Sequence, residues 1–432
     1  MTSPWCGTRA FPVKLQVEDS GTGVPVVPKE RTVSPDQSWQ RKMKLALLLG
    51  SIAFSAAAFL TLDWLRSTAI QRRREPAPET APCRIHDPVR HHALKPNCAF
   101  RDYWGQDSWE VTTNSLGFRD ERTREVPLAD PRPRILMLGD SFTLGVLAWR
   151  DSYVGRIAAH FPQYDFLNGG VGSYSPSNYL NVTRMVLAKG VDIDEVIVFI
   201  DISDVQDEAA FYRDVDASGA VTRIEQERMV ISWYAVWHDR IGRHFLLTYY
   251  LLDLCERFLV GHGFYHLSTG PYGNTFDTER SAWTYRKVNE TAPQVAGFAP
   301  LGVEGGIAKE KEKMTLLWQE LQKRNIAISI VVYPWPAQLV HDTVDSRQVR
   351  IWREWCEGKC KRFISLFPAF SAAKDQCPRI QPGCWYLRLF VFGDFHYNAA
   401  GNARVADAVI KSLVEAPPVK RRVKGPPGNP LG

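Results

Sequence analysis

The stretch Arg134-Ile-Leu-Met-Leu-Gly-Asp-Ser-Phe-Thr143 decides the fold of this chain. Its first five residues are apolar after the arginine and do not alternate with polar residues, which is typical of a strand covered on both faces of a parallel sheet. Gly139 and Asp140 then turn the chain and leave Ser141 at the carboxyl end of that strand. Ser141 is also expected to open a helix, where free N–H groups and the helix dipole favour negative charge. The stretch predicts an α/β sheet with a reactive serine at its carboxyl edge.

A second motif near the C-terminus, Gly393-Asp-Phe-His-Tyr-Asn398, supplies the partners that such a serine needs. A serine hydroxyl is a weak nucleophile until a neighbouring base takes its proton, and a carboxylate must orient that base. Ser141, His396 and Asp394 are therefore predicted to form a catalytic triad. Asp140 is interpreted as a structural residue of the turn.

These motifs resemble those of a known family. Gly139–Phe142 (Gly-Asp-Ser-Phe) is similar to the first block of the SGNH/GDSL hydrolases, and Asp394–His396 is similar to their last block. A last block of Asp, one residue, His, an aromatic residue and Asn is similar to the branch that contains periplasmic alginate O-acetyltransferases. Asn168–Tyr174 resembles the second block, and Asp201–Asp204 stands where the third is expected.

The resemblance implies an oxyanion site made by the backbone amides of Ser141 and Ser173 and by the side chain of Ser203. Two of these positions depart from the family pattern, because the asparagine of the third block falls at Ser203 and the glycine of the second block falls at Ser173. Serine is a shorter side-chain donor than asparagine, yet it offers the same backbone N–H as glycine. Trp335 follows a predicted strand and is a candidate platform for a sugar ring, with a core tryptophan as the alternative.

The pattern of the folded part predicts an α/β domain with a parallel sheet of about five strands. The resemblance implies that this domain has the three-layer, flavodoxin-like fold of SGNH hydrolases. Sites in such sheets lie beyond the carboxyl ends of the strands, where Ser141, Ser173, Ser203 and Trp335 are all expected. The predicted strands are 134–138, 165–167, 195–200, 326–333 and 363–366, and the predicted helices are 152–160, 178–189, 309–323 and 402–414.

An uncharged apolar run, Leu45–Leu62, precedes this domain and continues past Asp63. At a rise of 1.5 Å per residue, about 20 such residues cross a hydrocarbon core of about 30 Å. Basic residues precede the run, and the apolar sequence continues beyond the small residues Ala56–Ala58, which favours an uncleaved signal anchor over a cleaved signal peptide. A buried core helix is the third interpretation. The expected location is the inner membrane, with one span and the catalytic domain in the periplasm or outside.

The eight cysteines indicate an oxidising compartment. Cys83 and Cys98 flank a short loop, and four more are clustered at 356, 360, 377 and 384. They predict disulfide bridges whose pairing the sequence leaves open, with a zinc site in the cluster as the alternative. His86, His91 and His92 are interpreted as surface loop residues. The acidic residues Asp201, Asp204, Asp207 and Glu208 are interpreted as structural, so we expect neither a metal nor a cofactor.

The domain organisation follows from these features. The segment 205–304 is rich in Trp, Tyr and Phe and interrupts the hydrolase-like pattern, so it is predicted to be a lid over the site or a structural cap. Met43 is a candidate for the true start of translation. The predicted parts are a disordered tail (1–42), a transmembrane anchor (43–65), a linker (66–100), the two halves of the hydrolase domain (101–204 and 305–415) around the insertion (205–304), and a disordered basic tail (416–432).

The sequence thus predicts a membrane-anchored serine esterase acting on acyl esters, with acetyl esters of a carbohydrate as the expected substrate. An O-acyltransferase that moves acetyl groups onto an extracytoplasmic polysaccharide, together with biosynthesis or export partners, has the same triad and is the first alternative. A catalytically silent glycan-binding module is the second. The net charge of +6 is spread along the chain without a basic, aromatic stripe, so a nucleic-acid partner is not expected.

Overall fold

The structure, a computed structural model, describes residues 35–72, 83–104, 107–215, 219–223, 233–270, 273–286 and 295–421. The chain divides into two units, residues 1–59 and 60–432. Helix α1 (Pro35–Gln71) begins in the first unit and ends in the second. Its residues from Ser38 to Gln71 are long and apolar enough, as a helix, to cross a membrane, and no other helix of the described residues is. Residues 35–42, expected in a disordered tail, belong to this helix, whereas the rest of that tail and Cys6 lie outside the described residues.

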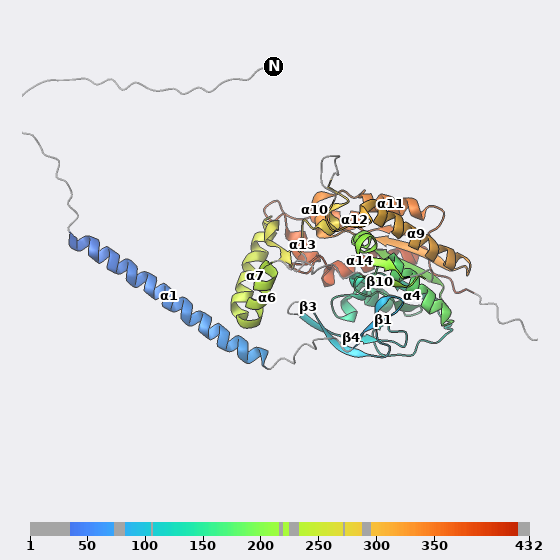
Figure 1. The fold of residues 1–432 in the computed structure, drawn as a ribbon, viewed down its shortest axis with the longest axis horizontal. Helices are drawn as coiled ribbons and strands as arrows, with labels where there is room; N and C mark the ends of the chain where they lie inside the picture. The colour runs from blue at the N-terminus through green and yellow to red at the C-terminus, as the bar shows by residue number, and fades with distance from the viewer. Residues whose placement is uncertain are drawn as a thin grey trace, which may run out of the picture. The chain divides into compact units, whose positions relative to one another are not determined.

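The second unit is built on one eight-stranded sheet (Figure 1). Its strand order is β14-β13-β8-β6-β7-β5-β4-β3, and the five strands from β14 to β7 are parallel. In chain order these five stand as 2-1-3-4-5, which is the flavodoxin-like arrangement. The strands are β3 (Ala99–Trp104), β4 (Asp107–Thr113), β5 (Arg119–Asp120), β6 (Arg134–Leu138), β7 (Asp165–Asn168), β8 (Glu195–Ile200), β13 (Ala327–Val332) and β14 (Arg362–Ser365).

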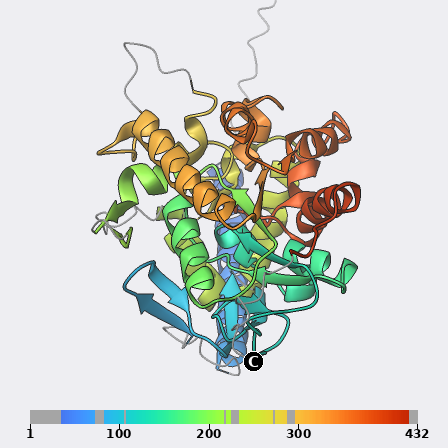
Figure 2. The same ribbon diagram turned by 90° about the vertical axis from the view of Figure 1, so that its right-hand side faces the viewer.

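Helices cover both faces of the parallel strands, which gives three layers (Figure 2). Alternate residues of β6 point to opposite faces, so Ile135 packs with α3 (Tyr153–His160) and α14 (Ala399–Glu415), while Leu136 packs with α4 (Pro176–Ala188) and α9 (Gly302–Gln322). Because both faces are dry, every residue of β6 is buried, as its unbroken apolar sequence predicts.

The five predicted parallel strands and four predicted helices are confirmed. Strands β3, β4 and β5, which were not predicted, extend this parallel sheet with antiparallel pairs. Strand β4 alternates between buried and exposed residues and β5 has only two residues, so neither resembles a strand of a covered parallel sheet.

Smaller elements surround the sheet. The expected linker contains a hairpin of β1 (Arg84–Asp87) and β2 (His91–Leu94). The segment 205–304 holds a π-helix (Asp207–Phe211), β9 (Tyr212–Asp214), β10 (Val221–Arg223), α6 (Trp233–His244), α7 (Leu246–Gly261), η3 (Tyr265–Leu267), β11 (Thr269–Gly270), β12 (Gly273–Asn274) and α8 (Glu279–Ala282). The remaining helices are α2 (Ser141–Leu144), η1 (Trp149–Asp151), α5 (Asp204–Gln206), α10 (Pro336–His341), α11 (Arg347–Cys356), α12 (Phe367–Asp375) and α13 (Cys384–Leu389).

Three disulfides join Cys83 to Cys98, Cys356 to Cys360 and Cys377 to Cys384. All four clustered cysteines are therefore bridged, which contradicts the zinc alternative. The expected disordered tail after residue 415 is partly ordered, because Lys420 forms ion pairs with Asp192 and Asp194. Residues 422–432 lie outside the described residues.

Arg119, at the beginning of β5, fixes the chain that follows the serine. Its guanidinium is buried and donates hydrogen bonds to the carbonyls of Leu144 (2.6 Å), Gly145 (2.6 Å) and Leu147 (2.5 Å). Burial lowers the pKa of Arg119 to about 10, so the side chain remains charged near neutral pH. One side chain thus satisfies three carbonyls at and just after the end of α2.

We expect Arg119→Met to lower the free energy of unfolding by about 3 kcal/mol, because it removes the donors of three carbonyls and each buried unsatisfied group costs about 1–3 kcal/mol. Thermal unfolding of the purified chain in detergent measures the effect. Arg119→Lys keeps a charge but not the fork of donors, so its free energy of unfolding should lie between those of the parent and the methionine variant. A methionine variant as stable as the parent would contradict this role.

Candidate functional site

The structure brings Ser141, His396 and Asp394 together beyond the carboxyl end of β6. The Ser141 Oγ lies 2.8 Å from His396 Nε2, and His396 Nδ1 lies 2.6 Å from Asp394 Oδ1. His396 is 2% exposed and Asp394 is 5% exposed, whereas Ser141 is half-buried. A hydroxyl, an imidazole and a carboxylate in this order and at these distances have the arrangement of a catalytic triad.

The loop of His396 and Asp394 is held from several sides. Asp394 Oδ1 also accepts a hydrogen bond from the His396 N–H (2.8 Å), so one oxygen orients both the backbone and the ring. The Asp394 N–H donates to the Tyr386 hydroxyl (3.1 Å), and burial raises the pKa of Tyr386 to about 12. Asn398 caps α14 by accepting from the N–H groups of Ala400 and Gly401. This cap explains the asparagine of the motif, because it begins the helix directly after the histidine.

The floor of the site is aromatic. The Phe142 ring lies 4.6 Å from the His396 ring, and Trp335 stacks on Phe395 with ring centroids 3.9 Å apart. Trp335 is 1% exposed, and its indole N–H donates to Asp201 (2.8 Å). The predicted sugar platform is thus a buried core residue in this structure, as the alternative interpretation had it.

A turn after β7 lies beside the serine. Ser173 has φ of +61°, and the Tyr174 N–H donates to the Val171 carbonyl (3.1 Å), as in a turn that prefers glycine at the position of Ser173. This is the position where the family pattern has glycine. The turn approaches the nucleophile closely, because a Cβ placed on Gly172 would lie 3.8 Å from the Cβ of Ser141.

Two side chains fix the direction of this turn. His92 Nε2 lies 2.8 Å from the Gly172 carbonyl, and the Tyr212 hydroxyl donates to the Ser173 carbonyl (2.7 Å). Because a carbonyl only accepts, Nε2 of His92 carries the proton. The N–H of Ser173 belongs to the same planar trans peptide as the Gly172 carbonyl and therefore points away from His92. The interpretation of His92 as a surface loop residue is therefore wrong, because His92 lies part-buried in β2. Tyr212 escaped the sequence analysis, since no local pattern connects it to the second block.

Ser203 lies in a buried turn after β8 and is 3% exposed. Its N–H donates to Asp201 Oδ1 (2.6 Å). Neighbouring carboxylates have partners as well: Asp204 accepts from the Tyr179 hydroxyl (3.1 Å), and Glu208 accepts from Ser175 and Ser177 and pairs with Lys309 (3.0 Å). These contacts agree with the structural interpretation of the acidic residues. Within the described ranges, no group of three or more His, Cys, Asp or Glu residues could hold a metal ion.

Burial and mutual repulsion raise the pKa values of several of these acids. Burial is the largest cause for Asp140, followed by the charge of Asp201. The pKa of Asp204 is raised by burial and then by the charge of Glu310, and that of Glu310 is raised by burial and then by the charge of Glu208. Asp140 also caps α2, accepting from the Phe142 N–H (2.9 Å), and its Oδ2 lies 3.4 Å from Ser141 Oγ.

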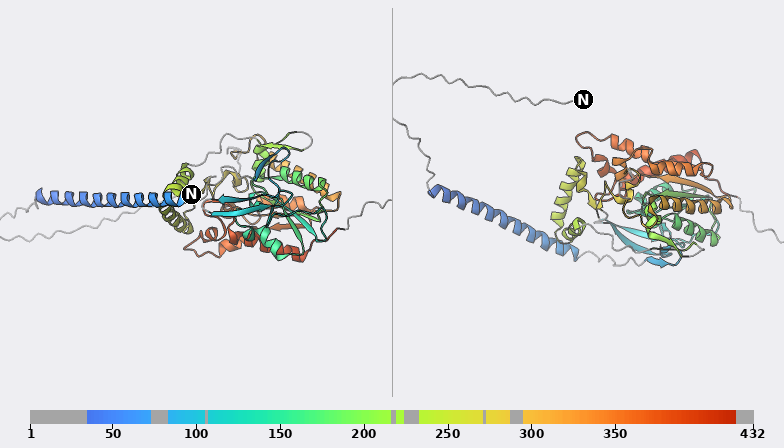
Figure 3. Two further views of the ribbon diagram at one scale, coloured as in Figure 1. Left: turned by 90° about the horizontal axis from the view of Figure 1, so that it is seen from below. Right: turned by 45° about the horizontal axis from the view of Figure 1, so that its top comes forward.

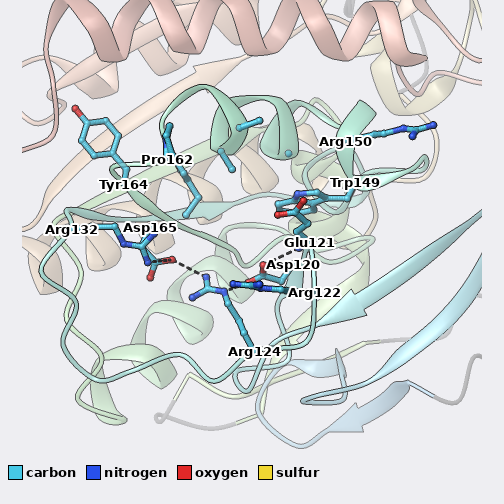
Figure 4. Close-up of a pocket in the computed structure, with 14 residues that line it drawn as sticks. Asp120, Glu121, Arg122, Arg124, Arg132, Trp149, Arg150, Pro162, Tyr164 and Asp165 are labelled. Atoms are coloured by element: carbon cyan, nitrogen blue, oxygen red, sulfur yellow. Dashed lines mark hydrogen bonds and ion pairs between the residues drawn. The ribbon is translucent and has the colours of Figure 1, made fainter.

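A cavity of about 450 Å³ lies at the other end of the sheet (Figure 4). Its lining includes Asp165, which begins β7, whereas Ser141 follows the last residue of the neighbouring strand β6. Four arginines line it, but Arg124 pairs with Asp120 and Asp165, and Arg132 pairs with Asp130. The cavity is therefore separate from the triad, and much of its positive charge is neutralised within the protein.

No family model and no curated protein matches the sequence. Solved structures similar to this chain include the psychrotrophic esterase EstA from Pseudoalteromonas sp. (9% identity, TM-score 0.32, covering 65% of this chain and 97% of that one). A second is a catalytic mutant of Axe2, an acetylxylan esterase from Geobacillus stearothermophilus (12% identity, TM-score 0.34, covering 65% of this chain and 94% of that one). A third is LAE5, an alpha/beta hydrolase enzyme from the metagenome of Lake Arreo (12% identity, TM-score 0.32, covering 66% of this chain and 97% of that one). Because these TM-scores are low, the similarity does not assign a function to this chain, and the geometry of the site is the basis for that assignment.

The raised pKa of Glu310 predicts a pH dependence of stability. A carboxyl group whose pKa is higher in the folded state stabilises the fold fully below its ordinary pKa, and this contribution is lost as the pH rises through the folded value. We therefore expect the free energy of unfolding to fall as the pH rises above the ordinary pKa of a glutamate, and Glu310→Gln to reduce that fall by at least about 1 kcal/mol. Denaturant titrations at several pH values measure the slope.

The matched control is Glu312→Gln, because Glu312 is exposed on the same helix. It should leave the slope of the parent unchanged. Equal slopes for the Glu310 variant and the parent would show that this carboxyl group is not responsible.

Proposed function

We propose that this chain is a serine esterase of the SGNH type that cleaves acyl esters of a carbohydrate, with acetyl as the expected acyl group. The observation that carries the proposal is the continuous hydrogen-bonded series from Asp394 through His396 to Ser141, with distances of 2.6 and 2.8 Å. The sequence blocks quoted above support the same assignment. The carbohydrate and the acetyl group rest on the resemblance of the last block.

The proposed mechanism has two halves. His396 Nε2 accepts the Ser141 proton while Oγ attacks the ester carbonyl, and Asp394 stabilises the resulting imidazolium. The N–H groups of Ser141 and Ser173 and the side chain of Ser203 bind the oxyanion. The tetrahedral intermediate then expels the sugar hydroxyl, which takes the proton from His396. Water attacks the acyl-enzyme with His396 again as the base, releases the acid and restores Ser141.

We further propose that α1 is an uncleaved anchor in the inner membrane and that the catalytic unit lies in the periplasm. The length and apolar composition of Ser38–Gln71 support a membrane span. Three disulfides support an oxidising compartment for the unit that carries the triad.

Acyl transfer to a sugar hydroxyl is the second candidate, because burial of the triad favours it. A transferase must keep water from the acyl-enzyme, and both His396 and Asp394 are almost fully buried. The esterase and the transferase share the first half of the mechanism. In the transferase, a polysaccharide hydroxyl replaces water as the acceptor of the acyl group. This candidate function implies partners in polysaccharide biosynthesis or export.

Ser141→Ala should abolish both hydrolysis of p-nitrophenyl acetate and labelling by a fluorophosphonate, because the attacking oxygen is removed. We expect the hydrolysis rate of the full chain in detergent to fall by about three orders of magnitude or more, and His396→Ala to have nearly the same effect. Unchanged melting temperatures would exclude unfolding as the cause.

The pattern of results separates the candidates. A chain that the fluorophosphonate labels but that hydrolyses p-nitrophenyl acetate slowly, and whose turnover of the ester rises when a sugar acceptor is added, would be identified as the transferase. A folded chain that is neither labelled nor active would contradict both enzymes and favour the silent glycan-binding module.

His92→Ala should lower kcat about tenfold with little change in KM, because the turn that presents the Ser173 N–H loses its hydrogen bond and an oxyanion donor acts mainly in the transition state. His92→Gln, which keeps an N–H donor, should recover part of the loss. Steady-state kinetics with the same ester measures both variants. An alanine variant with parental kcat would show that the turn holds its position without His92.

A further inference from the structure

Helices α6 and α7 form a hairpin within the segment 205–304 (Figures 1 and 3). The C-terminal end of α7 is fixed to the catalytic unit, because the Gly383 N–H donates to the Gly261 carbonyl (2.9 Å) just before α13. Arg257 also lies over the ring of Phe392, 4.5 Å from its centroid. Phe392 is two residues before Asp394, so α7 contacts the segment that leads into the catalytic loop.

One face of α7 is apolar and exposed. Leu247, Leu251, Leu254 and Phe258 are spaced by four, three and four residues and therefore form one stripe along the helix. Their exposed fractions are 47%, 48%, 64% and 63%. Single exposed leucines are common on protein surfaces, but a continuous stripe of four large apolar side chains indicates an interaction surface.

The polar residues of α7 lie elsewhere on the helix. Asp253 pairs with Arg257 (2.6 Å), and Arg257 is the residue that contacts Phe392. The helix is thus amphipathic, and its apolar stripe is exposed. In a helix that packs on its own protein, the apolar face is the buried one.

The beginning of α7 is fixed to the end of α1. Asp63 is the acidic residue within the apolar part of α1, and its two carboxylate oxygens accept hydrogen bonds from the N–H groups of Leu247 (2.9 Å) and Thr248 (2.8 Å). Ser67 accepts from the Leu246 N–H (2.7 Å). Asp63 is 4% exposed and Ser67 is fully buried, so side chains of α1 replace water as the cap of α7.

This cap brings the stripe to the membrane surface if α1 is the anchor. Asp63 and Ser67 lie in the last turns of α1, where the apolar run gives way to polar residues. Exposed Arg240 and Arg243 of α6 lie a few residues before the start of α7, where they can meet the phosphates of anionic lipids. An apolar stripe that begins at the end of a membrane span, with basic residues shortly before it in the chain, is typical of an interfacial helix.

We propose that α7 lies in the surface of the lipid bilayer beside the anchor, with Leu247, Leu251, Leu254 and Phe258 among the acyl chains and the arginines of α6 at the headgroups. The inference rests on the membrane anchoring proposed above, and it adds a second membrane contact that the anchor alone does not require. Since Arg257 and Gly261 connect α7 to the catalytic unit, this contact holds the Asp394–His396 loop close to the membrane surface.

Cys255 offers a direct test, because its thiol is exposed at the border of the stripe. The full chain with Cys6→Ser carries an environment-sensitive fluorophore on Cys255 and is placed in nanodiscs of phosphatidylethanolamine and phosphatidylglycerol, with or without bromine on the acyl chains. We expect the label to lose most of its emission in the brominated nanodiscs. Two reference labels, in a background that also has Cys255→Ser, are placed at Leu48→Cys in the anchor and at the exposed Glu312→Cys on α9.

The outcomes separate this inference from the anchoring on which it rests. Quenching at positions 48 and 255 but not at 312 is the expected result. Quenching at 48 alone overturns the interfacial helix and leaves the anchor intact. No quenching at 48 overturns the anchor and the inference together. Blue-shifted but unquenched emission at 255 shows that a protein covers the stripe, which also overturns lipid as its partner.

A charged variant of the stripe provides a second measurement. Leu251→Glu with Phe258→Glu should abolish the quenching at Cys255, because carboxylates oppose burial among acyl chains. Val414→Glu, at a residue of α14 that is 62% exposed, is the matched control and should leave the quenching unchanged. Quenching that persists in the double variant would contradict insertion of the stripe.

Discussion

The hydrogen bond between Ser141 and His396 constrains the rest of the structure, because it joins residues that are 255 positions apart. A hydrogen bond weakens steeply when its atoms move by a few tenths of an ångström, so both partners must be held by elements of one rigid core. Strand β6 holds Ser141 from the middle of the sheet, between β7 and β8. Asn402 of α14 links the two halves, since its side chain accepts from the Tyr153 N–H of α3 (3.0 Å) and donates to the Tyr397 carbonyl (3.0 Å).

The buried acids beside the serine pose an electrostatic problem that the structure solves in two ways. Asp201 accepts a hydrogen bond from Trp335. Glu208 accepts hydrogen bonds from Ser175 and Ser177 and pairs with Lys309. These contacts offset the cost of removing a carboxylate from water. Asp140 and Asp204 have raised pKa values, which favour their neutral forms. Neutral acids repel a developing oxyanion less than carboxylates do, so the second solution also suits the proposed chemistry.

Much of the fold could be predicted because its signals are local. The unbroken apolar sequence of β6 and the Asp-x-His-aromatic-Asn motif require no knowledge of distant contacts. The parts that failed depend on tertiary structure: the edge strand β4 is half exposed, and Trp335 is covered by Phe395 from another segment. His92 contacts a carbonyl 80 residues away, and nothing in the sequence around His92 encodes that contact. Cys255 lies on an apolar helix and is nevertheless exposed, because that helix turns its apolar stripe outward.

The outward orientation of the apolar stripe of α7 raises the question of what the segment 205–304 does. Its contacts reach the site in two places. Tyr212 donates to the Ser173 carbonyl (2.7 Å) in the turn beside Ser141. Ser268 donates to the Tyr386 hydroxyl (3.1 Å), which in turn accepts from the Asp394 N–H, and Arg257 lies over Phe392. The first contact acts on the turn beside Ser141, and the second acts on the position of the aspartate. Helix α7 is capped by Asp63 at one end and hydrogen-bonded at the other end to the residue before α13. Within the described residues, the segment therefore connects the end of α1 to the loop that carries Asp394.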